Sequence, residues 1–215
     1  MKIVLFDLDG TIADSLLIAI ETFNEMADFY RFESFQTDDL DEFRNMHFKD
    51  VLKNLHLMRY GILAPLLIWD FKRREGKKLK DGHPFPGMGR VLNELKDENY
   101  VVGLLTSNSK RNAKRFLKNH GLLDYFDFVR AEMNIFGKDK AIEKIMRRYE
   151  INKDEIVYVG DEARDVEACK KIDIPIISVD WGYNSTKIIV EHNPDYLATK
   201  PEEILDLVKI RWKED

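Results

Sequence analysis

The sequence predicts an α/β fold, in which a doubly wound, mostly parallel sheet carries an inserted, all-helical subdomain. Three observations predict it. Residues 2–6 form an apolar, β-rich run at the start of the chain. Only helical periodicity follows up to about residue 82, and from residue 87 onward short apolar runs alternate with helical stretches. Strands that alternate with helices imply right-handed crossovers, and the opening strand belongs to the resulting sheet.

The composition is that of an ordinary folded protein. The 215 residues are 44% hydrophobic and 34% charged, which is enough to bury a substantial core. The formal net charge of -5 argues against a nucleic-acid partner, because proteins that bind nucleic-acid backbone carry a basic surplus. The only cysteine, Cys169, is predicted to be a small hydrophobic residue on a helix. A single cysteine forms no disulfide framework, which favours a cytoplasmic setting. No apolar stretch is long enough to span a bilayer, so no membrane partner is expected.

The opening strand ends in Asp7, Leu8, Asp9, Gly10 and Thr11. In extended backbone, residues i and i+2 point to the same side, so Asp7 and Asp9 are expected to face one spot. Two carboxylates at that separation repel each other unless one takes a proton or a cation lies between them. The stretch therefore predicts an acid–base pair or a metal site.

The inserted helical block is predicted to cover residues 15–86. Asp14 and Ser15 are the candidate caps of its first helix. The turn-rich segment 81–87 is the expected hinge that ends the block. Apolar residues recur at helical spacing in four stretches, which are 16–30, a helix opened by Thr37, 48–58 and 63–74.

The rest of the core is predicted to be formed by residues 1–14 and 87–215, where strands and helices alternate. Strands are predicted over 100–106, 127–131, 155–159, 175–179 and 195–198. Helices are predicted over 88–97, 110–120, 138–149, 162–171 and 201–210.

Polar residues follow several of these strands, at the edge where open parallel sheets bind ligands. Carboxylates without partnering histidine or cysteine describe a site for a hard cation, and Mg²⁺ is the preferred cofactor. A hydroxyl, backbone amides and a lysine describe a clamp for phosphate, and phosphoryl transfer needs little else from a protein. Beyond the opening pair, the residues collected in this way are Thr106, Ser107, Asn108, Lys138, Asp161, Glu162 and Asp165.

These residues resemble, in order, the four motifs of the haloacid dehalogenase-like phosphatases. The motifs are D-L-D-G-T at 7–11, T-S-N at 106–108, a lysine after Gly137, and G-D-E-A-R-D at 160–165. Four motifs in this order, each at a strand end, make the match specific. The inserted helices resemble the type-one cap of the family, which closes over the substrate. The closest resemblance is to the phosphoglycolate phosphatase-like branch.

The resemblance implies Mg²⁺-dependent hydrolysis of a small phosphate monoester through an aspartyl-phosphate intermediate. Asp7 would attack phosphorus, and Asp9 would protonate the leaving oxygen and then take a proton from water. Mg²⁺ would be held by the Asp7 carboxylate, the Asp9 backbone carbonyl and Asp161. Outside these ligands, Asp165 would order the lysine or a metal-bound water, and Glu162 is either a supporting group or a simple helix acid.

The resemblance also implies a phosphate site. Thr106 and Lys138 would bind phosphate oxygens, assisted by the amides of Ser107 and Asn108. Lys138 is preferred to Lys140 because it directly follows the glycine.

Substrate choice is expected to reside in the cap. Arg44 is the first candidate to contact an anionic group of the substrate, because related enzymes often carry Arg-Gly at this place. Asn45 departs from that glycine. A basic run is interpreted as a solvated helix end, with anion binding as the less favoured reading; it consists of Lys72, Arg73, Arg74, Lys77, Lys78 and Lys80.

Other functions remain as alternatives. A phosphosugar mutase would share the same motifs and differ in its cap. Dehalogenases of this fold lack the second motif aspartate, Asp9, so a phosphatase is favoured over them. A receiver-type signalling module would carry its acceptor aspartate on a middle strand and have no helical insertion. The expected partner is a small phosphorylated metabolite, and the expected assembly is a monomer or homodimer.

Overall fold

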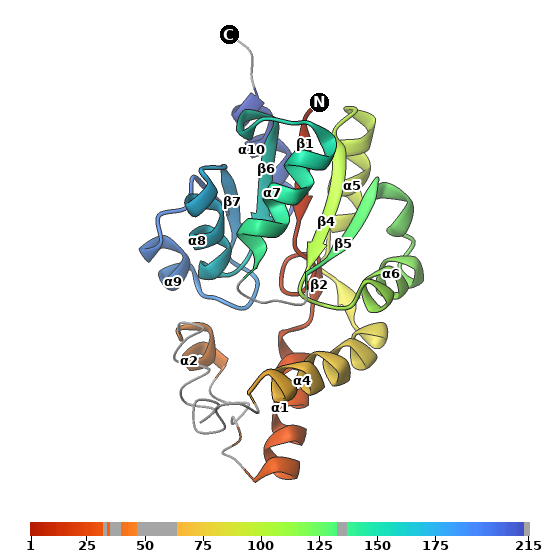
Figure 1. The fold of residues 1–215 in the computed structure, drawn as a ribbon, viewed down its shortest axis with the longest axis vertical. Helices are drawn as coiled ribbons and strands as arrows, with labels where there is room; N and C mark the ends of the chain where they lie inside the picture. The colour runs from red at the N-terminus through yellow and green to blue at the C-terminus, as the bar shows by residue number, and fades with distance from the viewer. Residues whose placement is uncertain (32–33, 35–39, 47–63, 133–136, 213–215) are drawn as a thin grey trace.

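The computed structural model describes residues 1–31, 34, 40–46, 64–132 and 137–212. Within them, a parallel six-stranded sheet runs in the order β5-β4-β1-β6-β7-β8 (Figure 1). The predicted doubly wound α/β fold is confirmed. The strands are β1 (Ile3–Phe6), β4 (Val101–Thr106), β5 (Phe128–Ala131), β6 (Ile156–Gly160), β7 (Ile176–Val179) and β8 (Tyr196–Ala198).

The opening strand lies at the centre of this sheet. Phe6, its last residue, pairs with Leu104 of β4 on one side and with Val159 of β6 on the other. All three strands run in the same direction, so the polar residues that follow them meet at one edge.

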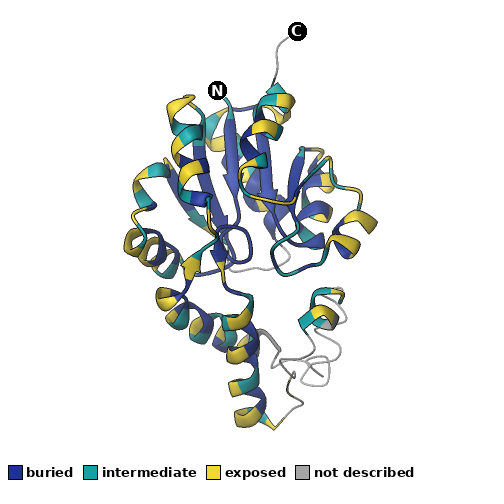
Figure 2. Ribbon diagram, turned by 180° about the vertical axis from the view of Figure 1, so that it is seen from behind, coloured by how far each residue is buried: buried dark blue, intermediate teal, exposed yellow. Residues whose placement is uncertain are grey.

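Helices cover both faces of the sheet. One hydrophobic cluster joins the sheet to α5, α6 and α10, and a second joins its other face to α7 and α8. Figure 2 shows the strands as the most buried part of the chain, with exposed residues on the outer sides of the helices. The bounds are α5 (Met88–Asp97), α6 (Lys110–Asn119), α7 (Lys138–Tyr149), α8 (Ala163–Ile172), α9 (Thr186–Glu191) and α10 (Glu203–Trp212).

The predicted elements of the alternating part are all present within two residues of their expected bounds. Cys169 is buried on α8, as expected for a small hydrophobic residue. The short helix α9 was not predicted, because its Ile188-Ile189-Val190 run favours extended structure and six residues carry no helical period. Short 3-10 turns lie at Leu79–Asp81, Leu123–Tyr125 and Lys153–Glu155.

A separate group of helices, which we call the helical unit, lies beyond the carboxyl edge of the sheet (Figure 1). It consists of α1 (Leu16–Tyr30), α2 (Leu40–Arg44) and α4 (Ala64–Lys78). Tyr30 of α1 donates a 3.2 Å hydrogen bond to Asp70 of α4, which ties the two long helices together. The predicted start of the second helix at Thr37 and the third stripe, 48–58, lie outside the described residues. The boundaries 15–86 stay a prediction.

The two connections between the helical unit and the sheet pair with each other. The strands β2 (Ala13–Asp14) and β3 (His83–Pro84) are antiparallel, and Asp14 lies opposite His83. Two residues per strand give no sequence pattern, so this ribbon was not predicted within the expected hinge. No helix in the described part of the chain combines the length and apolarity needed to cross a membrane.

Candidate active site

Asp7 directly follows the central strand and is almost fully buried. Its backbone N–H donates a 2.9 Å hydrogen bond to the carbonyl of Val159, which continues the pairing with β6. Its carboxylate has two different partners. Oδ1 accepts a 2.7 Å hydrogen bond from the Leu8 N–H, and Oδ2 contacts the ammonium group of Lys138. One carboxylate oxygen of Asp7 is thus fixed by a backbone N–H and the other by a cation.

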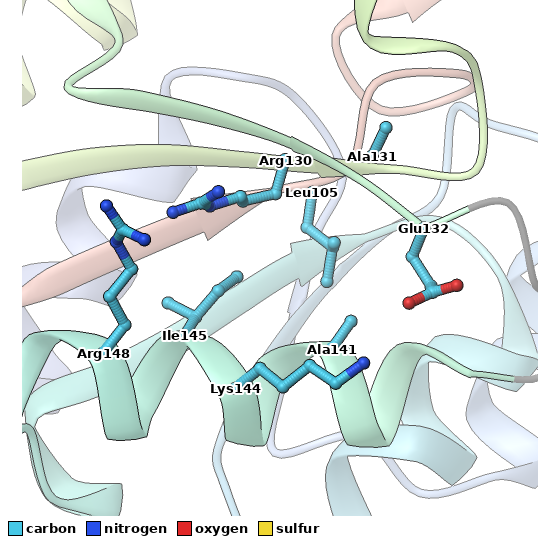
Figure 3. A pocket seen from close by; sticks show the side chains of 8 residues that line it. All are labelled: Leu105, Arg130, Ala131, Glu132, Ala141, Lys144, Ile145 and Arg148. Atoms are coloured by element: carbon cyan, nitrogen blue, oxygen red, sulfur yellow. The ribbon is translucent and has the colours of Figure 1, made fainter.

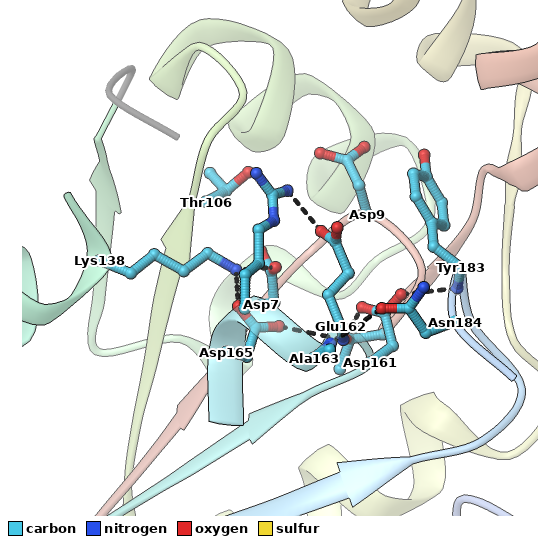
Figure 4. Close-up of polar contacts among 12 residues, drawn as sticks. Asp7, Asp9, Thr106, Lys138, Asp161, Glu162, Ala163, Asp165, Tyr183 and Asn184 are labelled. Atoms are coloured by element: carbon cyan, nitrogen blue, oxygen red, sulfur yellow. Dashed lines mark hydrogen bonds and ion pairs between the residues drawn. The ribbon is translucent and has the colours of Figure 1, made fainter. Parts of the chain in front are cut away.

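Asp7, Asp161 and Asp165 form a carboxylate cluster, in which one oxygen of each lies within 4.8 Å of the others. Asp161 follows β6 and is fully buried. Its Oδ1 accepts a 2.7 Å hydrogen bond from the Thr11 hydroxyl, and its Oδ2 accepts one of 2.7 Å from the Tyr183 N–H (Figure 4). The orientation of this carboxylate is therefore set from two sides.

Gly10 lets the opening turn lie against Asp161. Its φ of +78° falls in the left-handed region, and a Cβ atom at this position would lie 2.1 Å from Asp161 Oδ2. Any side chain here would both strain the turn and displace the carboxylate.

Lys138 enters the cluster from the start of α7. It is buried, and its ammonium group contacts both Asp7 and Asp165. Burial alone would lower the pKa of Lys138, but the adjacent charges of Asp165 and Asp7 raise it well above its usual value. Lys140 is exposed two residues later. This geometry supports the choice of Lys138 over Lys140.

The remaining acids differ in their electrostatic surroundings. Burial, with the charges of Glu162 and Asp7, raises the pKa of Asp161 well above its usual value. Burial also raises the pKa of Asp165, to about 6. Burial opposes ionisation of Glu162, but the ion pair with Arg164 and the charge of Lys138 together outweigh it and hold the pKa of Glu162 below the usual range.

The charges in and around the cluster do not balance when its acids are ionised. The three cluster carboxylates and the adjacent Glu162 then face two cations, Lys138 and Arg164. Carboxylate oxygens are hard donors. Among the described residues, the cluster contains no histidine or cysteine. The residues present therefore fit a hard divalent cation such as Mg²⁺.

Asp9 has a different set of neighbours. Its carboxylate is turned away from the cluster (Figure 4), and its two oxygens lie 3.5 and 3.4 Å from the Asn108 side-chain amide. Burial, followed by the charge of Glu75 on α4, raises the pKa of Asp9 to about 7. A carboxyl group with such a pKa is suited to carry a proton near neutral pH.

The predicted phosphate-binding residues at the end of β4 are brought to the same edge. Thr106, Ser107 and Asn108 are all buried. The Asn108 N–H donates a 2.9 Å hydrogen bond to the Thr106 hydroxyl, and the Asn108 side-chain oxygen accepts a 2.8 Å bond from the Ser109 N–H. The turn is thereby fixed next to Asp9.

Two residues of α4 reach the site and were missed in the sequence. Glu75 is fully buried, and Lys72 donates a 2.8 Å hydrogen bond to it. Burial would lower the pKa of Lys72, but Glu75 and Asp9 raise it. The interpretation of Lys72 as part of a solvated helix end is wrong, although Lys77 of the same run is exposed. The three-residue spacing of Lys72 and Glu75 was the available signal, since it places both on one helix face.

Arg44 lies at the end of α2 and contacts the core. Its guanidinium donates to the backbone carbonyl of Asp180, which follows β7. Its Nε is buried and has no hydrogen-bond partner among the described residues. A contact between Arg44 and substrate stays a prediction.

The loop 180–185 was also missed. Its backbone holds Asp161 through Tyr183, and its Asn184 side chain accepts a 2.9 Å hydrogen bond from the Ala163 N–H at the start of α8. This loop follows β7, so the rule that collected polar residues at the other strand ends would have found it.

A cavity of about 340 Å³ lies elsewhere, between β5 and α7 (Figure 3). None of the predicted site residues lines it, so it is separate from the carboxylate cluster. Its lining combines the charged side chains of Arg130, Glu132, Lys144 and Arg148 with apolar ones that include Leu105 and Ile145.

A parallel sheet with a carboxylate-rich site at the ends of its central strands defines an enzyme of the α/β class. The chain belongs to the haloacid dehalogenase-like hydrolase family, whose profile matches residues 4–179. The predicted family and hydrolase class are thereby confirmed.

Named relatives cover nearly the whole chain. Phosphoglycolate phosphatase of Synechococcus elongatus is 29% identical over 208 residues, with 97% of each chain aligned. Pyrophosphatase PpaX of Halalkalibacterium halodurans is 23% identical over 211 residues, again with 97% of each chain aligned. The crystal structure of a predicted phosphatase from Clostridium acetobutylicum has a TM-score of 0.81 at 22% identity, covers 96% of this chain and 97% of that one, and shows the same fold.

Proposed function

We propose that the protein hydrolyses a small phosphate monoester with the help of Mg²⁺, through an aspartyl-phosphate formed on Asp7. One observation carries this proposal. The Asp7 carboxylate lies in a cation-deficient cluster beside Lys138, whereas Asp9 is held apart with a pKa of about 7. One carboxylate is thus placed to act as a nucleophile and the other to carry a proton.

In the first half-reaction, a carboxylate oxygen of Asp7 attacks phosphorus and the bond to the ester oxygen breaks. The departing oxygen takes the proton of Asp9, which becomes a carboxylate. Lys138 and Thr106 bind the phosphate oxygens and offset their charge.

In the second half-reaction, Asp9 takes a proton from water while the water oxygen attacks phosphorus. The bond between phosphorus and Asp7 breaks, which releases inorganic phosphate and restores the Asp7 carboxylate. Asp9 is again protonated, so the cycle closes with no residue changed.

The Asp7 and Asp161 carboxylates and the backbone carbonyl of Asp9 would hold Mg²⁺, with Asp165 and Glu162 outside these ligands. When bound, the ion supplies positive charge that offsets the repulsion between the carboxylates and the incoming phosphate. The excess of two carboxylates over the two cations supports this assignment.

The helical unit acts as a cap in this proposal, and its α4 faces the leaving-group side of the site. Lys72 lies near Asp9 in an ion pair with Glu75, and its ammonium group is the donor of α4 that we assign to a leaving group with its own carboxylate. Several relatives are named phosphoglycolate phosphatase, and 2-phosphoglycolate has such a group. We therefore propose small acidic phosphate esters as the preferred substrates, with a cytoplasmic setting.

The test is a panel of 2-phosphoglycolate, a neutral alkyl phosphate, a sugar phosphate and pyrophosphate, assayed with Mg²⁺ and with a chelator. Asp7→Asn is the control, because it keeps the shape of the side chain but not the nucleophile. We expect phosphate release only from the parent enzyme with Mg²⁺. Release that survives the substitution or the chelator overturns the mechanism, and isomerisation of the sugar phosphate without net release identifies a mutase.

A further inference from the structure

The loop 180–185 touches the carboxylate cluster and all three helices of the helical unit. We infer that Tyr183 is a positioning residue, which aligns Asp161 for Mg²⁺ only while the helical unit is seated on the core. The inference rests on the proposed function, since it assigns Asp161 to the metal. It adds a means by which the position of the helical unit controls the metal site.

On the core side, the loop fits tightly around Asp161. The Tyr183 N–H donates the 2.7 Å hydrogen bond to Asp161 Oδ2. A Cβ atom at Gly182 would lie 2.3 Å from the same oxygen and 2.4 Å from the Gly10 carbonyl oxygen. The Trp181 indole N–H donates a 3.1 Å hydrogen bond to the Thr11 carbonyl. A small shift of this backbone therefore changes the orientation of Asp161.

On the other side, the ring of the same tyrosine reaches the helical unit. The Tyr183 hydroxyl lies 3.2 Å from Glu75 Oε1 on α4 and 3.1 Å from the Ser15 hydroxyl, at the start of α1. Ser15 occupies the N-cap position of α1, yet its side chain makes no capping hydrogen bond. Glu75 is fully buried, so the tyrosine hydroxyl satisfies a charged group that water does not reach.

Tyr183 thus joins the core to the helical unit. Its backbone amide holds Asp161, and the hydroxyl of its rigid ring contacts α4 and the start of α1. Movement of α1 and α4 away from the core would break both hydroxyl contacts and free the ring, so that the backbone amide that orients Asp161 would be held less firmly.

The far end of the loop is anchored to α2. The Ser185 N–H donates a 2.8 Å hydrogen bond to the Arg44 carbonyl, and the Ser185 hydroxyl donates one of 2.6 Å to the Asn45 side chain. The Asn184 amide donates a 3.2 Å bond to the Met46 carbonyl. The long helices α1 and α4 and the short helix α2 therefore all contact the same loop, residues 180–185.

Tyr183→Phe tests the inference, because it keeps the ring and the backbone amide and removes only the hydroxyl. Partners that support a metal ligand typically contribute 10- to 100-fold in metal affinity, so we expect the Mg²⁺ dissociation constant, measured by calorimetry, to rise roughly tenfold. Hydrogen exchange should also become faster at the amide of residue 183. Tyr30→Phe is the matched control, since its hydroxyl bonds Asp70 within the helical unit, and it should change neither quantity.

Glu75→Ala gives a second break of the same contact, and it also removes the partner of Lys72. It should weaken Mg²⁺ binding as Tyr183→Phe does, and the two losses should not add fully in the double variant, because both variants remove the hydrogen bond between Tyr183 and Glu75. Unchanged Mg²⁺ affinity and amide exchange in both single variants overturn the inference. Both readouts are independent of turnover, so a parent enzyme that hydrolyses no phosphate ester would refute the proposed function separately.

Discussion

The hydroxyl of Thr11 donates a 2.7 Å hydrogen bond to Asp161, which lies 150 residues further along the chain. The contact joins the turn after the first strand to the turn after β6, across the centre of the sheet. Both atoms are buried, so no water replaces the bond if it is lost. The threonine of the opening motif therefore orients a carboxylate of the cluster, besides helping to end a strand.

Thr11→Val tests this contact, because valine keeps the shape of threonine and lacks its hydroxyl. Asp161 would keep its hydrogen bond from the Tyr183 amide and lose the one from the residue 11 hydroxyl. We therefore expect Mg²⁺ affinity to fall by roughly 10-fold. Thr11→Ser retains the hydroxyl and should bind Mg²⁺ nearly as the parent does. Equal affinities for the two variants, measured by calorimetry, would contradict the role of the hydroxyl.

Lys138 is expected to be essential for turnover. Lys138→Met leaves Asp7 and Asp165 without the cation that contacts both, and it removes a donor for the phosphate. We expect kcat to fall by roughly 10²- to 10³-fold, as when one preorganised donor is removed from other active sites.

Lys140→Met is the matched control for this substitution, because Lys140 is an exposed lysine on the same turn of helix. It should keep the kcat of the parent enzyme. A similar loss of kcat in both variants would refute the choice of Lys138 as the phosphate-binding lysine.

Asp9→Asn should separate substrates by their leaving groups. An alkyl phosphate needs a proton on its departing oxygen, so its kcat/KM should fall by roughly 10²- to 10⁴-fold, the usual contribution of a general acid. An aryl phosphate with an acidic phenol leaves without that proton and should lose much less in the first half-reaction. Burst kinetics on both esters measure this step. An equal loss for the two esters would remove Asp9 from the role of acid.

The metal-free protein should lose stability as the pH rises from about 4 to about 7. Burial raises the pKa of Asp165 to about 6 and that of Asp9 to about 7, both above the usual 3.8 of aspartate. Between those values the folded state binds more protons than the unfolded state, so the free energy of unfolding falls with rising pH. The loss begins near pH 4 and is complete once the pH has passed about 7.

Urea midpoints measured across this pH range, with a chelator and with Mg²⁺, check the expectation. Mg²⁺ should raise the midpoint more at high pH, where the carboxylates are ionised. The Asp9→Asn variant has no titratable group at residue 9, so its urea midpoint should decrease less as the pH rises. A midpoint that rises with pH in the chelated protein would contradict the electrostatic account.

Lys72 should affect substrate choice more than chemistry. Lys72→Met removes the positive charge near Asp9, so KM for 2-phosphoglycolate should rise more than KM for a neutral alkyl phosphate, with smaller changes in kcat. Lys77→Met, an exposed lysine on the same helix, is the control. A KM increase of the same size for both esters would indicate a structural effect instead.

The sheet and the cluster could be predicted because each depends on a local pattern. Apolar runs that end in Asp7, Thr106 and Asp161 mark the strands and also place those side chains at one edge. The roles of Glu75 and Tyr183 could not be predicted in this way, because each depends on how the helical unit sits on the core. That packing depends on contacts between residues far apart in the sequence, such as the one between Glu75 and Tyr183.

The strands β2 and β3 pair at the point where the chain passes between the core and the helical unit. Because Asp14 lies opposite His83, the chain leaves the core and returns to it at one point, as it would for a single hairpin loop. The six parallel strands pair only with one another, and β2 and β3 form a separate sheet. Another helical insertion grafted onto this ribbon should therefore alter substrate range and leave Asp7 and Lys138 in place. It would align Asp161 only if it supplied new partners for the Tyr183 hydroxyl.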